Sequence, residues 1–309
     1  MKNSGIVNVY KEKGYTSFDV VAILRKTFHI KKVGHTGTLD PDAEGVLPVC
    51  FGKATKVCDL LTDKDKVYRA TMHLGITTDT EDMTGNVTSQ REVTCTEDEI
   101  RRVMMEFVGD LMQVPPMYSA LKVNGKKLYE LAREGIEVER KARSIHIFSI
   151  EIEEIALPLV TFSVHCSKGT YIRTLCKDIG EKLGCGACME RLLRTRVSCF
   201  DLEHALKLEE IKERFEKCDM DDFIYDVDSI FSHTKKAIVK EDSYRYALNG
   251  AALLEHNFVS VFDASEREVT FLDLEGESSI RVYLEDGSFV GIYDCKDGIC
   301  KLRKMFYES

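Results

Sequence analysis

Three acidic side chains, Asp40, Asp42 and Glu44, stand close together in the stretch KVGHTGTLDPDAEGVLPVCFGKATK, which spans residues 32–56 and also carries His35. Four glycines and two prolines interrupt the stretch, and no helical or strand period of apolar residues persists between Gly34 and Gly45, so we predict a loop there. Asp40 precedes a proline, which favours extended backbone at the aspartate. A carboxylate on such a glycine-flanked loop can be held facing a cleft. The same residue types are common in surface turns, and composition alone favours the turn.

The stretch resembles the signature of the TruB family of tRNA pseudouridine synthases, GHTGTLDPxAxGxLPxxxGxATK. Every fixed position of that signature is present between Gly34 and Lys56. The resemblance implies that Asp40 is the catalytic nucleophile and that His35 helps to hold the opened RNA loop. It also implies a reaction that breaks the C1′–N1 bond of uridine, turns the base and rejoins it through C5, with no metal and no small-molecule cofactor.

Two more segments resemble signatures of that family. KVYRATMHLGITTDTED resembles KxYxAxxxLGxxTDTxD, and SKGTYIRTLCKDIGEKLG resembles SxGTYIRxLxxDxGxxLG. The resemblance implies that Tyr68 stacks on the target base and transfers a proton, and that Tyr171 contacts the flipped base. A core tyrosine with a satisfied hydroxyl is the structural alternative for Tyr68.

The resemblance also implies that Arg173 pairs with Asp40. An arginine in the first turn of a helix is unfavourable for the helix dipole, so Arg173 needs another reason to be there, such as a carboxylate partner. An opposite charge nearby lowers the pKa of an aspartate by about 1–3 units, whereas burial raises it. We therefore expect the pair to keep Asp40 ionised.

The arginine-rich segment MERLLRTRVSCF resembles the closing segment of the family's synthase domain, which implies that Leu192 or Leu193 lines the base pocket. The chain opening resembles KPxGxTSxxVV, with Glu12 in place of the proline. Lys11 of this opening is a candidate substrate contact, and a solvated surface lysine is the alternative.

The segment QVPPMYSALKVNGKKLYELAREG resembles QxPPxYSAxKxxGxxxYxxAR, which in the family belongs to a mobile thumb that closes over the RNA arm. We place the thumb at about residues 116–145. Seven basic and four acidic residues lie between Ser119 and Ile145. An exposed helical hairpin is the alternative.

A net charge of −9 opposes phosphate binding, yet the charge is unevenly distributed. Residues 201–309 carry 14 basic and 25 acidic side chains, whereas residues 1–200 carry 29 and 27. The first two thirds of the chain can therefore present a basic face, and we expect the acidic last third to touch RNA less.

The 11 cysteines are odd in number and irregular in spacing, so we predict reduced thiols. Cys185 and Cys188 form one C-x-x-C without a second pair or a histidine pair, so core packing is favoured over a zinc or redox site. No apolar run approaches the length of a membrane span, and the opening residues lack the apolar core of a signal peptide. We expect a cytoplasmic protein that does not enter a membrane.

Capping boxes at Thr16–Asp19 and Thr96–Glu99 predict two helix starts. In the first helix we expect Phe18, Val21, Leu24 and Phe28 on the buried stripe, and we expect Thr170 to cap a later helix. The expected strands before the tail are residues 5–10, 66–74, 144–152 and 159–166, and the expected helices are about 17–28, 97–107, 126–134, 171–183 and 207–217. In the tail we expect a helix near 241–248 and strands at 257–262, 268–273, 280–284, 289–294 and 299–303.

These features indicate an α/β protein of mixed α+β type. We predict a pseudouridine synthase domain at 1–232, with a central, mainly antiparallel sheet and an active-site cleft, and a small PUA-like β-barrel at 233–309. The resemblance implies a monomeric enzyme that isomerises uridine 55 in the T-arm of tRNA without a cofactor. The alternatives are a non-catalytic tRNA-folding chaperone and a guide-RNA-dependent pseudouridine synthase, although relatives of the second kind carry longer basic extensions.

Overall fold

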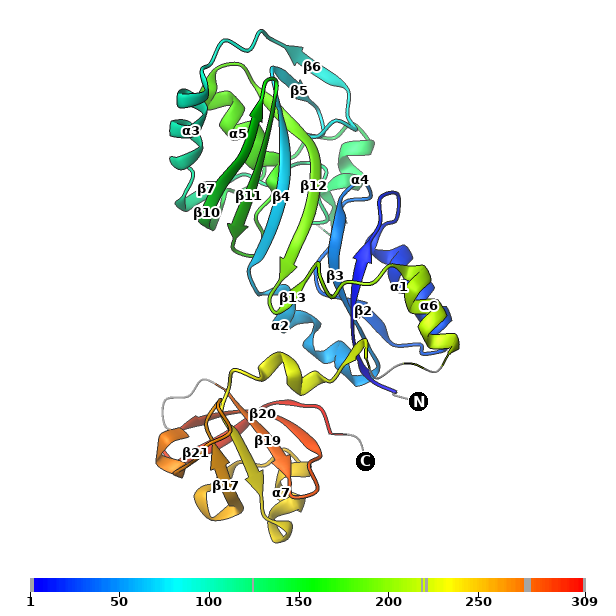
Figure 1. Cartoon of the computed structure of the whole chain (residues 1–309), viewed down its shortest axis with the longest axis vertical. Coiled ribbons are helices and arrows are strands. Elements are labelled where there is room, and N and C mark those ends of the chain that lie inside the picture. The colour runs from blue at the N-terminus through cyan, green and yellow to red at the C-terminus, as the bar shows by residue number, and fades with distance from the viewer. Residues whose placement is uncertain (1–2, 124, 218, 220–221, 275–278, 308–309) are drawn as a thin grey trace.

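The computed structural model describes residues 3–123, 125–217, 219, 222–274 and 279–307. Its largest element is a ten-stranded sheet in the order β14-β1-β3-β12-β4-β11-β10-β7, with β13 beside β12 and β2 beside β3 (Figure 1). All neighbouring strands are antiparallel except β12 and β3, which run parallel. The strands are Gly5–Lys11 (β1), Val33–His35 (β2), Glu44–Phe51 (β3), Lys66–Leu74 (β4), Gly109–Gln113 (β7), Arg143–Ala156 (β10), Leu159–Cys166 (β11), Ala187–Val197 (β12), Phe200–Asp201 (β13) and Ile224–Tyr225 (β14).

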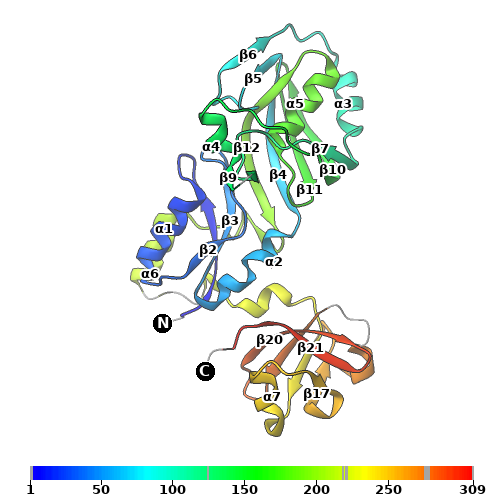
Figure 2. The same ribbon diagram turned by 180° about the vertical axis from the view of Figure 1, so that it is seen from behind.

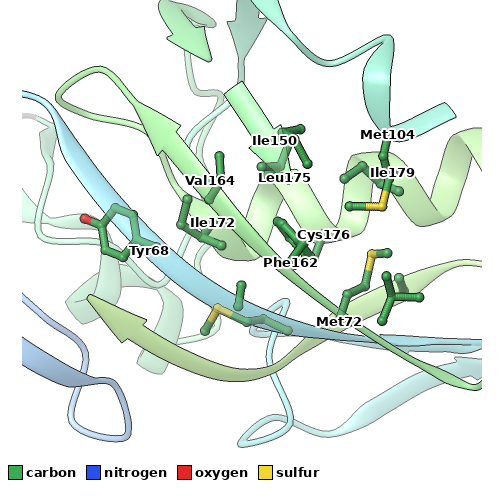
Figure 3. Close-up of a cluster of buried hydrophobic side chains, with 14 of the residues drawn as sticks. Tyr68, Met72, Met104, Ile150, Phe162, Val164, Ile172, Leu175, Cys176 and Ile179 are labelled. Carbon is green, nitrogen blue, oxygen red and sulfur yellow. The ribbon is translucent and has the colours of Figure 1, made fainter. Parts of the chain in front are cut away.

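Two helices, α3 (Glu97–Met105) and α5 (Ile172–Leu183), cover one face of this sheet (Figure 2). Strand β4 points its alternate side chains at them, as the period of two predicts, and Met72 belongs to the same buried cluster as Phe162 of β11 (Figure 3). Both side chains are fully buried, and burial of each contributes about 1.5–3 kcal/mol. The core therefore fixes α5, whose first turn carries Arg173.

A second pair of helices, α1 (Ser17–Thr27) and α6 (Leu208–Glu216), packs side by side against β1 and β3 (Figures 1 and 2). The predicted capping box between Thr16 and Asp19 is present. The predicted buried stripe is wrong at Phe18, which is 68% exposed, because the inward face of α1 also takes Val20.

Smaller elements surround this sheet. They are Gly52–Val57 (η1), Cys58–Thr62 (α2), Ile76–Thr78 (β5), Val87–Gln90 (β6), Lys122–Val123 (β8), Lys126–Lys127 (β9), Leu128–Arg133 (α4) and Val227–Phe231 (η2). The predicted cap of α5 is wrong, because Tyr171 is the N-cap residue and the Thr170 hydroxyl donates to the Ser167 carbonyl at 2.9 Å. The predicted left-handed stop at Gly184 is present, with φ 82°.

A second, curled sheet of seven strands lies below the first in the order β16-β21-β20-β19-β15-β17-β18 (Figure 1). Its strands are Lys236–Val239 (β15), Leu253–Leu254 (β16), Phe258–Phe262 (β17), Glu268–Val269 (β18), Ile280–Leu284 (β19), Phe289–Lys296 (β20) and Ile299–Met305 (β21). Its helical turns are Glu241–Ser243 (η3), Tyr244–Leu248 (α7), Glu255–Asn257 (η4) and Phe271–Leu274 (η5). The mixed α/β class with a mainly antiparallel sheet and a β-rich tail is thus confirmed.

The tail differs from expectation in two places. The strand predicted at 268–273 ends at Val269 and is followed by η5. The cysteines Cys295 and Cys300, predicted to be thiols, form a disulfide, because they lie directly opposite each other on β20 and β21 with their Cα atoms 4.0 Å apart. The other cysteines among the described residues are free, including Cys185 and Cys188, both of which are buried.

The two sheets are joined by polar and apolar contacts. The Lys304 ammonium lies 2.6 Å from the Asp59 carboxylate, and the Lys56 ammonium donates to the Met305 carbonyl at 2.8 Å. The rings of Phe289 and Phe306 stack at this junction, with centroids 5.6 Å apart. Across the described ranges, we find no helix with the length and hydropathy needed to cross a membrane.

Candidate active site

The loop that carries Asp40 joins β2 to β3, so it is shorter than the loop predicted between Gly34 and Gly45. The Lys11 ammonium donates to the carbonyls of Pro41 at 3.0 Å and Ala43 at 2.6 Å, which fixes the turn directly after Asp40. Burial lowers the pKa of Lys11 to about 8. Lys11 is fully buried, which contradicts the solvated surface position that the sequence left open and disfavours the candidate substrate contact.

Arg173 and Asp40 form an ion pair. The Nε atom of Arg173 lies 3.1 Å from Oδ2 of Asp40, and Nη2 lies 3.5 Å from Oδ1. The guanidinium also donates to the carbonyls of Thr80 at 3.1 Å and Tyr118 at 2.8 Å. Only 6% of the Arg173 side chain is exposed, against 41% for Asp40, so the arginine is fixed beneath a carboxylate that remains open to solvent. The pairing predicted from the sequence is therefore present in the structure.

A second carboxylate, Asp82, shares this guanidinium at 3.5 Å from Nη1. Its Oδ1 accepts from the Thr80 hydroxyl at 2.8 Å and the Thr84 amide at 3.0 Å. Asp82 is the last acid of the TDTxD segment, but it was not among the predicted site residues. Its place in the site depends on a contact between distant parts of the chain, which the sequence does not show. The site is thus an Asp–Arg–Asp arrangement.

Burial raises the pKa of Asp40 above the usual value for an aspartate, Arg173 lowers it, and Asp82 raises it again. The direction of the sum is upward. The sequence analysis expected Arg173 to outweigh burial and lower the pKa of Asp40. The net shift is instead upward, because burial and the second carboxylate together outweigh the arginine.

Tyr68 lies on β4 with its side chain among the buried residues, directly opposite Arg194 on β12. Burial raises the pKa of Tyr68, and the hydrogen-bonded Arg194 lowers it. Arg194 is fully buried and donates to the carbonyls of Val46 at 2.7 Å and Gly37 at 3.1 Å. The sequence analysis missed it, because one arginine among several in MERLLRTRVSCF gives no signal of burial.

The structure separates the two leucine candidates. Leu192 pairs with Ala70 and Leu193 with Arg69, and directly opposite residues of an antiparallel pair share a face. Leu192 therefore lies on the face that carries Tyr68, and Leu193 lies on the other face. Both leucines line the cleft described below.

Tyr171 lies near Asp40 and Arg173, and His35 lies near Arg194. The backbone of Tyr171 is fixed by Gln113, which accepts from its amide at 2.8 Å and donates to its carbonyl at 3.1 Å. The Gly37 amide donates to Nδ1 of His35 at 3.2 Å, and burial lowers the pKa of this histidine. The exposed Phe18 ring packs edge-on against His35, with centroids 5.7 Å apart, so it extends the half-buried surface beside the loop.

Asp40 opens into a cleft of about 760 Å³. Its lining includes Asp82 and Leu192 together with the basic side chains of Arg69 and Arg191. Among the described residues, no cluster of three or more potential metal ligands occurs. A half-exposed carboxylate that is held by a buried arginine and opens into a cleft can act as a nucleophile toward a bound substrate, so the site is that of a candidate enzyme.

Comparison with known proteins specifies the family. A family model described as "TruB family pseudouridylate synthase (N terminal domain)" matches residues 25–172, and "tRNA pseudouridylate synthase B C-terminal domain" matches residues 173–232. A protein from Lachnoclostridium phytofermentans named tRNA pseudouridine synthase B is 52% identical, covering 94% of this chain and 95% of the relative. A protein of the same name from Alkaliphilus oremlandii is 53% identical over 80% of this chain and 82% of its own. The chain belongs to the TruB family of pseudouridylate synthases.

Solved structures agree with this family. A chain in "Structure of H/ACA RNP bound to a substrate RNA containing 2'-deoxyuridine" has a TM-score of 0.72 and 25% identity, covering 98% of this chain and 85% of its own. A chain in "Crystal Structure of a Cbf5-Nop10-Gar1 Complex" has a TM-score of 0.72 at 27% identity, with the same coverage. The likeness extends over both sheets, and the curled C-terminal sheet fits a PUA-like domain.

Proposed function

We propose that this chain isomerises uridine 55 in the T-arm stem-loop of tRNA to pseudouridine, with Asp40 as the nucleophile. Pseudouridine synthase activity on tRNA follows from the family and from relatives that bear that name over nearly the whole chain. The observation that carries the proposal for this chain is the 3.1 Å ion pair between Arg173 and a cleft-facing Asp40. It provides the charged oxygen that the reaction needs.

The remaining site residues take roles that their positions support. Removing uridine from its stack costs a few kcal/mol, and stacking on an aromatic side chain returns about 1–3 kcal/mol per base. Tyr68 and Tyr171 would supply that stacking, Leu192 would line the base pocket, and His35 would fill the space that the base leaves. Either route of attack, at C6 of the ring or at C1′ of the ribose, requires ionised Asp40.

The segment 116–145 would act as a thumb on the RNA arm. Its Tyr118 carbonyl accepts from the Arg173 guanidinium at 2.8 Å, so movement of the thumb would shift the guanidinium relative to Asp40. We place the domain boundary at residue 232, before the first strand of the curled sheet. The enzyme would act as a monomer in the cytoplasm, and Lys11 would serve it by supporting the Asp40 turn rather than by contacting RNA.

A sequencing experiment tests this proposal. The purified chain is incubated with unmodified tRNA, and pseudouridine is mapped at single-nucleotide resolution. We expect one new pseudouridine in the T-loop with no guide RNA added. Modification at another position would contradict the T-arm assignment, and dependence on a guide RNA would favour the guided class.

Asp40→Asn separates catalysis from chaperone activity. The variant is expected to form no pseudouridine while binding tRNA within a few fold of the wild type. Asp42→Asn removes a neighbouring exposed carboxylate of the same loop and serves as the matched control, with activity largely retained. Pseudouridine formation by Asp40→Asn at the wild-type rate would show that another residue is the nucleophile.

A further inference from the structure

Arg194 is a buried cation at the centre of the large sheet, on β12. It is 1% exposed and is among the largest fully buried side chains of the described chain. No carboxylate in the described ranges forms an ion pair with it, and two further buried cations, Lys11 and Lys66, lie near enough to repel it. Burying an unpaired charge costs several kcal/mol, so the hydrogen bonds of this guanidinium must stabilise it.

Those hydrogen bonds reach two parts of the active site. Arg194 donates to the Gly37 carbonyl at 3.1 Å, three residues before Asp40, and to the Val46 carbonyl at 2.7 Å, at the start of β3. Its third contact is the side chain of Tyr68, its direct neighbour across β12 and β4. The same cation therefore supports the loop of the nucleophile and touches the phenol of the proposed proton-transfer residue.

We propose that Arg194 is a positioning residue whose buried positive charge favours the phenolate form of Tyr68, so that Tyr68 can take the proton from C5 of the rejoined uracil. This inference rests on the function proposed above. The groups facing the Tyr68 phenol are Arg194 from β12, Cys166 from β11 and Asp40 from the loop. Burial is the largest influence and raises the pKa of Tyr68, Cys166 and Asp40 raise it further, and the net direction is upward. Arg194 is the cation among these groups and limits that rise.

The proton balance of the reaction requires such a base. Forming the C1′–C5 bond leaves C5 tetrahedral, with its original hydrogen still attached. The Tyr68 phenolate takes that proton, the ring double bond is restored, and N1 gains one proton from solvent. Product and substrate are isomers, so no oxidant, reductant or co-reactant is needed. A neutral, buried tyrosine without a cation beside it would be a poor base.

The test measures the titration of residue 68 directly. 2,3,5-Trifluorotyrosine, whose phenol titrates near neutral pH, is placed at position 68 and followed by ¹⁹F NMR in three backgrounds: wild type, Arg194→Met and Arg194→Lys. We expect its pKa to rise by at least about one pH unit in Arg194→Met and by less in Arg194→Lys, which keeps the charge. Arg196→Met removes another arginine of β12, 45% exposed, and is expected to leave the titration unchanged. An unmoved titration in Arg194→Met overturns the inference.

A kinetic measurement separates this role from a structural one. In Arg194→Met, single-turnover conversion of tRNA carrying 5-deuterouridine is expected to be slower than conversion of the protonated substrate by at least about twofold, because proton removal at C5 becomes limiting. Equal loss of rate in Arg194→Met and Arg194→Lys with no isotope effect would mean that the arginine only supports the loop, and overturns the inference. Arg194→Gln, which can still donate to one carbonyl, replaces Arg194→Met if that variant does not fold.

The two proposals fail in different ways. A wild-type protein that makes no pseudouridine would refute the proposed function, while a titration that responds to Arg194 would still support the electrostatic contact. Active wild-type protein with a titration that ignores Arg194 would refute only the inference.

Discussion

Removing the charge of Arg173 tests the electrostatics of the site most directly. In Arg173→Met the guanidinium is lost from Asp40 at 3.1 Å, from Asp82 at 3.5 Å and from two backbone carbonyls. Because burial and Asp82 both raise the pKa of Asp40 and Arg173 opposes them, the pKa of Asp40 must rise further in the variant. The site then holds a protonated, non-nucleophilic acid over a wider range of pH.

The size of the effect follows from the geometry. An opposite charge at this distance shifts the pKa of a carboxyl by about 1–3 units, and one unit corresponds to about 1.4 kcal/mol. Since 41% of the Asp40 side chain is exposed, solvent screens the pair, and we expect about 1–2 units. Below the new pKa the single-turnover rate should fall about 10–100-fold, and the acid limb of the pH–rate profile should move up by about 1–2 pH units. Affinity for tRNA should stay within about threefold, because the buried arginine cannot reach the substrate.

The assay is single-turnover release of tritium from tRNA labelled at C5 of uridine, with affinity measured by filter binding. Lys182→Met is the control, since Lys182 lies in the last turn of the same helix and pairs with Glu106 at 2.5 Å, outside the cleft. Thermal melting checks that Arg173→Met is folded at the assay temperature. An acid limb that does not move, with the variant folded and the control normal, would refute the ion-pair reasoning.

Three further changes follow from the same contacts. Asp82→Asn should move the acid limb to lower pH in single-turnover assays, because Asp82 raises the pKa of Asp40, and an unchanged limb would contradict this. Lys11→Met should remove a pH dependence of stability that urea unfolding detects in the wild type. The pKa of Lys11 is about 8 in the folded protein and 10.5 in the unfolded chain, so the unfolded chain binds more protons between these pH values. The free energy of unfolding of the wild type should therefore rise with pH in this range, and that of the variant should not. Gly45→Ala should lower the free energy of unfolding by at least about 2 kcal/mol in urea titrations, because Gly45 has φ 106° and its added Cβ would lie 2.2 Å from the Arg194 carbonyl oxygen; a loss below about 0.5 kcal/mol would contradict that fit.

Local patterns predicted the elements that carry the site, and long-range pairing explains most of what they missed. The period-two face of β4 and the caps of α1 and α3 follow from neighbouring residues alone. Strand β12 was missed because its central position, between β3 and β4, buries parts of both faces and hides the alternation. Strand β15 was also missed, because its four residues, Lys236–Val239, are too short a run to give a clear alternation.

The signatures located the ion pair of the site but not the two buried cations, Lys11 and Arg194, that support the segment around Asp40. Asp40 and Arg173 were paired correctly because each belongs to a signature, whereas Lys11 was expected near the surface and Arg194 was not singled out. From sequence alone, a lysine or arginine is expected to be exposed to solvent, since burial is rare for these residues. Here both cations donate to backbone carbonyls of the segment around Asp40. They therefore stabilise the loop rather than bind phosphate. The net direction of the Asp40 pKa depends on this three-dimensional balance, and the order of residues could not have supplied it.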